Sequence, residues 1–231
     1  MSQKLHAKTK GSITLKGSTS LVTEYFEYAI NQILFLRGIY PEEDFKRTQV
    51  RGLNTQVTTD MQLIEYLKKI LDQVRMWLNQ EKLSRLVLTI NSRETRETLE
   101  RWQFNIELEE NYKENKTAAA RNENGEQEEE GAAAAAEISV EKTKTESEIN
   151  RELRDIIKQI VSTVTFMPTL VEKCTFNVLV YTENDVEVPT AWVDSDPHHV
   201  RNPEVVKLRT LNTDIHKVDT MVSYRRDEEL C

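Results

Sequence analysis

The residues that most often carry out chemistry in proteins are few in this chain and poorly placed for it. The chain has four histidines and two cysteines in 231 residues. His198 and His199 are adjacent in the turn-like sequence SDPHHV, and adjacent side chains of an extended segment point to opposite faces, which disfavours chelation by the pair. Cys174 falls in an apolar strand pattern, where a buried thiol is expected, and Cys231 is the last residue. The sequence therefore predicts no metal site.

The chain also lacks the short motifs of nucleotide-binding and hydrolytic enzymes. It contains no GxGxxG, Walker, GxSxG, HExxH or CxxC sequence, and six glycines are too few for a glycine-rich phosphate loop. Carboxylates are plentiful, but most fall on polar helix faces or in one acidic segment. We therefore expect no enzyme and no cofactor. A small enzyme that uses scattered carboxylates is the alternative from a different functional class.

The negative charge is concentrated in one segment. The formal net charge is −8, and residues 107–148 alone hold 13 acidic and 5 basic residues, so the remainder is balanced. Without a basic excess, the folded part has no general attraction for nucleic acid phosphates. The longest apolar run, Ala29 to Leu36, is too short to cross a bilayer, and the first residues lack the apolar core of a signal peptide. Sparse cysteine indicates the cytosol or nucleus.

Three amphipathic helices and three strands would form the framework. Apolar residues recur at helical spacing in residues 18–37, 60–78 and 146–164. Thr59 with Gln62, and Thr145 with Glu148, have the spacing of capping boxes. Strand patterns occupy residues 86–90, 99–108 and 174–181, the first of them apolar throughout, as in a strand covered on both faces. The pattern predicts an α+β fold.

Three further segments complete the chain. Residues 1–12 are expected to be a flexible leader and residues 226–231 a tail, on either side of one domain that spans residues 13–225. Residues 109–145, with runs of acid and alanine, cannot bury enough apolar surface to order themselves. They predict a flexible insertion, and an acidic docking segment is the alternative.

The C-terminal segment, residues 182–225, has strand-forming content but weak register signals. It has no glycine and no Asn-Gly or Asp-Gly pair, and prolines interrupt it. Such a segment could pair with a sheet in more than one place. From the pattern alone, an ordinary C-terminal meander remains the other interpretation.

With these elements placed, six stretches resemble one known family. They are GSITLKGS (11–18), INQILFLRGIYPEEDF (30–45), LERWQF (99–104), IIKQIVSTVTFMPTL (156–170), VLVYTENDVEVPTAW (178–192) and TDIHKVDTMVSY (213–224). These stretches follow one another closely and resemble, in the same order, stretches of the spindle-assembly-checkpoint HORMA-domain proteins, the mitotic arrest deficient two family. A HORMA adaptor for a DNA-repair polymerase or for meiotic chromosome axes is the alternative.

The resemblance implies a switch with two conformers. Three helices would pack on a β-sheet, and residues 182–225 would form the family's mobile safety belt. In the open form the belt covers the sheet border at the third strand. In the closed form it crosses to the second strand, and the vacated border accepts a closure-motif peptide. The implied role is to delay anaphase until kinetochores attach.

The resemblance also implies roles for individual residues. The partner-peptide edge and belt residues would be Leu179, Tyr181, Trp102, Trp192, His216, Val218, Met221, Val222 and Tyr224. Lys158, Gln159 and Phe166 match a dimer surface, although the familiar member has arginine where Lys158 stands, and lysine lacks the bidentate fork. Leu15 and Trp77 would affect the balance of conformers.

The implied partners are all proteins. They are the checkpoint coiled-coil scaffold, the activator of the anaphase-promoting complex, other members of the mitotic checkpoint complex, an AAA+ remodelling ATPase with a HORMA-type adaptor, and a second copy in an open–closed dimer. No nucleic acid and no membrane span are expected. The implied locations are the nucleus, the kinetochore and the cytoplasm, with the nuclear envelope reached through the scaffold.

Overall fold

The computed structural model describes residues 13–123, 144–183 and 186–226. The predicted leader, residues 1–12, and most of the predicted tail lie outside the described residues, as do residues 124–143 of the insertion. Each predicted helix is present. They are α1 (Leu15–Leu36), α2 (Met61–Asn79) and α4 (Glu146–Val164).

Two of the helix starts differ in detail from the sequence prediction. α1 begins three residues early, because the Thr14 hydroxyl accepts a hydrogen bond from the Gly17 amide at 3.1 Å. α2 is capped by Asp60 and not by Thr59, since the Asp60 carboxylate accepts from the Leu63 amide at 2.8 Å. α4 starts with the predicted capping box of Thr145 and Glu148.

One antiparallel sheet forms the second layer of the molecule. Its strands run in the order β5-β3-β4-β8-β6, with β7 paired to β8. Their bounds are β3 Leu83–Ser92, β4 Thr98–Leu108, β5 Cys174–Thr182, β6 Pro203–Lys207, β7 Leu211–Asn212 and β8 His216–Arg225. Residues 86–90 of β3 are entirely buried, as predicted for a strand covered on both faces.

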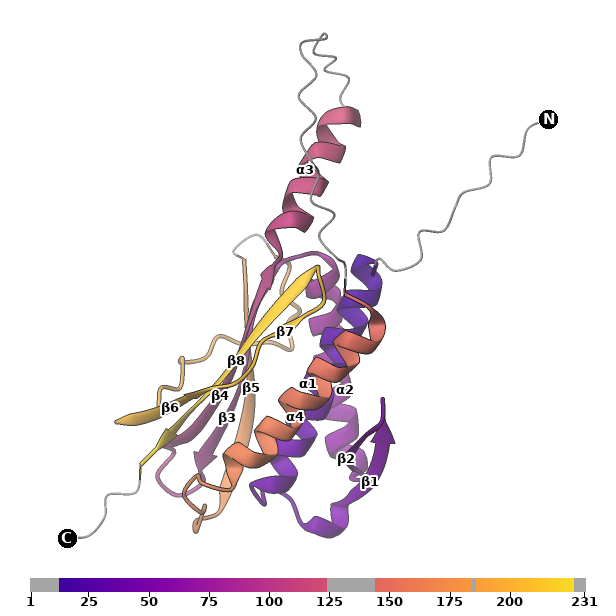
Figure 1. The fold of residues 1–231 in the computed structure, drawn as a ribbon. Coiled ribbons are helices and arrows are strands. Elements are labelled where there is room, and N and C mark those ends of the chain that lie inside the picture. Colours follow the sequence, from indigo (N-terminus) through magenta and orange to yellow (C-terminus); the bar gives the residue numbers. More distant parts are fainter. Residues whose placement is uncertain (1–12, 124–143, 184–185, 227–231) are drawn as a thin grey trace.

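The helices lie against one face of this sheet (Figure 1). The rings of Tyr25 and Phe26 on α1 lie 5.7 and 5.5 Å from that of Phe104 on β4, in edge-on geometry. Side chains alternate along a strand, so even-numbered residues of β4 such as Trp102 face the helices, and odd-numbered ones such as Arg101 face the opposite side. We call these the helix face and the outer face.

A small hairpin was not predicted. After a short 3-10 turn, Glu42–Asp44, strands β1 (Phe45–Val50) and β2 (Leu53–Thr58) pair with each other and lie apart from the main sheet. Their two-residue turn, Arg51-Gly52, has φ of 48° and 75°. Positive φ at both central positions is the geometry that matches the twist of a hairpin.

The insertion is not structureless throughout, which corrects the sequence prediction. Residues Glu110–Glu123 form a helix, α3, which extends away from the sheet in Figure 1. The Tyr112 hydroxyl donates to the Glu81 carboxylate at 3.0 Å, and the Lys116 ammonium binds the same carboxylate. Alanine, glutamate and lysine favour helix, a preference that the compositional argument for disorder did not weigh.

The C-terminal segment follows an irregular path before β8. Residues 186–192 have strand-like composition but form no strand. The later turns use non-glycine residues at positive φ, including Asn202 at 44° and Asp214 at 68°. Asn and Asp tolerate this conformation better than most residues, so these turns form without the glycine pairs that usually mark a hairpin in sequence.

Candidate functional site

Strand β5 forms a border of the sheet. Among the described residues, only β3 pairs with it, so one row of its backbone N–H and C=O groups has no neighbouring strand. Leu179 and Tyr181 both lie on this strand and are partly buried. They pair with Val87 and Arg85 of β3 and so belong to the outer face. The Arg85 guanidinium carbon lies 5.1 Å from the centre of the Tyr181 ring, a cation–π contact that the sequence did not indicate.

The chain leaves β5 along helix α2. The Glu183 amide donates to the Lys82 carbonyl at 3.1 Å, and the Glu183 carboxylate pairs with the Lys82 ammonium at 2.7 Å. Further on, the Trp192 ring lies 5.3 Å from that of Trp77 on α2, at an interplanar angle of 65°. Between α2 and this part of the chain is a hollow of about 550 Å³, whose lining includes Met76 and Val186.

The belt then reaches the other side of the sheet. The Arg101 guanidinium, on the outer face of β4, donates to the Pro197 carbonyl at 3.2 Å. Helix α2 stands over β5, since the ring centres of Tyr66 on α2 and Phe176 on β5 are 5.8 Å apart. The chain lies against α2 at Trp192 and on the outer face at Pro197, so it passes from the helix layer to the outer face next to the β5 border. Figure 1 shows this length of chain leading on to β6.

The last strand lies on β4, far from the β5 border. β8 is three positions from β5 in the sheet, and pairs along its length with β4, from Leu108–His216 to Glu100–Tyr224. His216, Val218, Val222 and Tyr224 are buried on the helix face, whereas Met221, opposite Gln103, is on the outer face. The structure therefore does not bring these five residues to Leu179 and Tyr181. It has the arrangement that the resemblance assigns to the closed form.

A buried ion pair joins Arg37, the residue that directly follows α1, to Glu100 of β4, which pairs with Tyr224 near the end of β8. The Arg37 guanidinium lies 2.5 Å from the Glu100 carboxylate, and both side chains are nearly inaccessible. The indole N–H of Trp102 donates to the other Glu100 oxygen at 3.0 Å. Burial raises the pKa of Glu100, and Arg37 opposes that shift. Trp102 is thus a core residue whose polar atom is satisfied inside the protein.

His216 anchors the start of β8 to helix α1. Its Nδ1 lies 2.6 Å from the Ser18 hydroxyl, which is also 2.6 Å from the Thr213 hydroxyl. The side chain is almost completely buried, and this burial lowers the pKa of His216 to about 4, against a smaller opposing effect of Glu81. The imidazole is therefore neutral at physiological pH.

The predicted dimer surface lies on and just after α4. Lys158 and Phe166 are exposed, Phe166 to 61%. Gln159 is engaged within the chain, because its side-chain oxygen accepts from the Arg209 amide at 2.8 Å, next to an ion pair between Arg209 and Asp155. The structure thus separates the three predicted residues into two free side chains and one that holds the belt.

The two residues predicted to affect the conformer balance lie in different surroundings. Leu15 is the partly buried first residue of α1, and Trp77 is buried beneath Trp192. Both tryptophans were predicted as functional residues, but their contact with each other was not. The polar group around Lys144, Glu152 and Asn212 was not predicted either, since its only sequence signal is the turn-forming Asn-Thr-Asp at 212–214.

Two features are absent from the part of the chain that the structure describes. It contains no group of three or more histidine, cysteine, aspartate or glutamate residues placed to hold a metal ion. None of its helices is long and apolar enough to cross a membrane.

Comparison with known proteins gives a consistent result. The HORMA domain model matches residues 18–216. The mitotic spindle checkpoint component mad2 of Schizosaccharomyces pombe is 44% identical over 214 residues, which are 93% of this chain and 95% of the relative. A chain in the crystal structure of the mitotic checkpoint complex is 43% identical, with a TM-score of 0.73 over 91% of this chain and 99% of that one.

A more distant structure shares the fold alone. Caenorhabditis elegans HTP-1, solved bound to HTP-3 motif-1, is 15% identical, with a TM-score of 0.67 over 93% of each chain. This likeness without close sequence similarity shows that the two chains share the fold.

Proposed function

The chain belongs to the HORMA-domain family and to its mitotic spindle checkpoint branch, and from this premise we propose that it is a two-state switch that traps a partner peptide at the β5 border. The observation that carries the proposal is the outer edge of β5, with which no described strand pairs and next to which the belt passes from one face of the sheet to the other. The product of trapping would be a checkpoint complex that delays anaphase.

The hydrogen-bonding groups at the edge of a β-sheet explain how a peptide would be trapped. An extended peptide can pair with the N–H and C=O groups on the outer edge of β5, and these backbone hydrogen bonds give affinity. Alternate side chains of the peptide would meet the outer face at Leu179 and Tyr181, or the helix face at Phe176 and the side of α2, which gives selectivity. Because the belt would then enclose the peptide, release requires the belt to move and should be slow.

The same belt must have a second place in the sheet. We propose that residues 216–224, paired here with β4, can instead pair with β5 when no client is bound. Two packings of one sequence interconvert only if their free energies differ by a few kcal/mol. An AAA+ remodelling ATPase with a HORMA-type adaptor would reverse the closure.

The proposed clients follow from the family. They are the checkpoint coiled-coil scaffold and the activator of the anaphase-promoting complex, together with other members of the mitotic checkpoint complex. A second copy of the chain would pair through the Lys158 side of α4. The chain would act as an adaptor and not as an enzyme, in the nucleus, at kinetochores, in the cytoplasm, and through the scaffold at the nuclear envelope.

A titration with synthetic peptides tests the proposal. Peptides with the closure motif of the scaffold or of the activator should bind, and the amides of β5 should gain protection from hydrogen exchange. The matched control is a peptide of the same composition in scrambled order. Binding of DNA-repair or meiotic-axis closure peptides in preference to both checkpoint peptides would favour the alternative adaptor function.

A further inference from the structure

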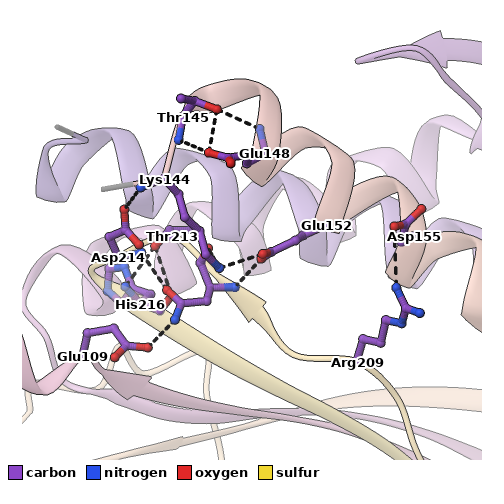
Figure 2. Close-up of polar contacts among 11 residues, drawn as sticks. Glu109, Lys144, Thr145, Glu148, Glu152, Asp155, Arg209, Thr213, Asp214 and His216 are labelled. Carbon is purple, nitrogen blue, oxygen red and sulfur yellow. Dashed lines mark hydrogen bonds and ion pairs between the residues drawn. The ribbon is translucent and has the colours of Figure 1, made fainter. Parts of the chain in front are cut away.

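The two ends of the acidic insertion meet at the turn between β7 and β8 (Figure 2). At one end, the Glu109 amide donates to the Ile215 carbonyl at 2.9 Å, and the Glu109 carboxylate accepts from the Asn212 side chain at 2.6 Å. At the other end, the Lys144 amide donates to the Asp214 carboxylate at 2.6 Å. One short turn, residues 212–215, is thus held from both ends of the insertion.

The Lys144 side chain adds a link to helix α4. Its ammonium donates to the Glu152 carboxylate at 2.7 Å and to the Asn212 carbonyl at 3.2 Å. The second Glu152 oxygen accepts from the Asn212 amide at 3.2 Å. The pair of Lys144 and Glu152 therefore satisfies both backbone groups of Asn212. Their side chains are only 28% and 31% exposed, so water weakens the pair less than it would at an open surface.

The residues that bind this turn are adjacent to regular secondary structure. Lys144 directly precedes the capping box of α4, in which the Thr145 amide donates to the Glu148 carboxylate at 2.8 Å. Glu109 directly follows β4. The turn itself is shaped by a hydrogen bond from the Asp214 amide to the Asn212 side chain at 2.7 Å. The groups that bind the turn thus lie at the end of β4 and at the start of α4, outside the segment that is proposed to move.

We infer that Lys144 and Glu152 are positioning residues that hold the belt in the arrangement with β8 on β4. The inference rests on the proposed two-state function. If β8 moved to the outer side of β5, it would cross about four strand spacings, or roughly 20 Å, and the contacts of residues 212–215 with Glu109, Lys144 and Glu152 would break. Contacts made in only one of two states shift the equilibrium toward that state.

Hydrogen exchange on the full chain, without any client, tests this inference. Lys144→Met should raise the exchange rates of the β8 amides about fivefold, which is the effect typical of losing one partly shielded charged pair. The amides of residues 86–90 in β3 should not change, because they do not depend on the turn. Lys144→Arg keeps the charge and the donors and should restore exchange to nearly the wild-type rates.

Lys69→Met is the matched control, since it removes an exposed ion pair with Glu65 on α2, remote from the turn. It should leave β8 unchanged. Unaltered exchange of β8 in Lys144→Met, or an equal acceleration in β3 and β8, would overturn the positioning role. A client peptide that alters neither β5 nor β8 in the wild type would instead contradict the proposed function, so the two failures can be told apart.

Discussion

Protonation of His216 would place a charge on an almost completely buried side chain. Because the folded protein lowers the pKa of this residue from 6.5 to about 4, the folded state favours the neutral ring. The stability contributed by the neutral ring is complete above pH 6.5 and is lost as the pH falls toward 4. The loss attributable to this residue should reach about 3 kcal/mol at pH 4.

Urea unfolding at several pH values measures this effect. His216→Gln should be less stable than the wild type at pH 7, because the contact with Ser18 is altered, but its stability should fall less between pH 6.5 and 4. The difference between the two pH profiles isolates the histidine from the carboxylates. Parallel profiles would show that His216 titrates in the folded state as it does in the unfolded chain.

Arg37 and Glu100 illustrate a different cost of burial. Arg37→Met should lower the free energy of unfolding by about 3–5 kcal/mol, because it leaves a buried carboxylate without its cation. Arg37→Met combined with Glu100→Gln should recover part of that loss, since no buried charge remains. Chemical denaturation of the wild type and the two variants checks the order of stabilities. A double variant less stable than Arg37→Met alone would contradict the explanation.

Single residues were predictable where a local rule decides their role. The Thr145–Glu148 capping box follows from four positions of sequence and is present. Asp60 displaced Thr59 as the cap of α2 by one position, because both are good caps and only the path of the preceding chain selects between them. The partners of Lys144 and Arg101 could not be foreseen, since they lie across the fold from these residues.

At the scale of elements, the side chains on and just after helix α4 fall into two sets with different roles. Asp155 and Gln159 bind the chain between β6 and β7, while Lys158 and Phe166 are exposed. A test of self-association should therefore leave Gln159 intact, because its loss would also loosen the belt. This separation is visible only in the structure.

Lys158→Ala combined with Phe166→Ala should leave a monomer. The pair removes one charge and one large exposed apolar side chain from the proposed dimer surface, without affecting any intramolecular contact described above. Analytical ultracentrifugation over a range of concentrations is the measurement, with Lys69→Ala as a control on α2. Sedimentation that matches the wild type at all concentrations would place self-association on another surface.

Elements with strong periodicity were predicted from sequence, and those defined by turns were not. Helices α1, α2 and α4 and strands β3, β4 and β5 follow from the apolar pattern. The β1–β2 hairpin was missed because its turn is Arg-Gly and not the more frequent Asn-Gly. Helix α3 was missed because its residues are good helix formers with almost no apolar face, and its contacts with Glu81 are tertiary.

At the scale of the whole molecule, the sheet has two borders and the sequence alone does not choose between them. The alternation of β8 suits either place, because buried residues at even positions would meet the helix layer in both. What selects β4 in this structure is a set of distant contacts, among them His216 with Ser18 and Asn212 with Lys144. Such contacts leave no local pattern in the sequence.

The central claim is that β8 must leave β4 before a client can reach the enclosed β5 border. Glu107 and Lys217 face each other across β4 and β8, at a spacing suitable for a disulfide between cysteines. Glu107→Cys with Lys217→Cys, in a chain whose Cys174 and Cys231 are changed to serine, would fix β8 in place when oxidised. The lost ion pair is exposed and contributes little to stability.

The measurement is the association rate of a closure-motif peptide with the oxidised and the reduced form of this variant. Reduction should restore the rate of the serine-substituted parent, and the oxidised form should bind at least a hundredfold more slowly, since the belt cannot open. Equal rates in the two forms would show that clients reach β5 without displacement of β8, and the proposed switch would be wrong.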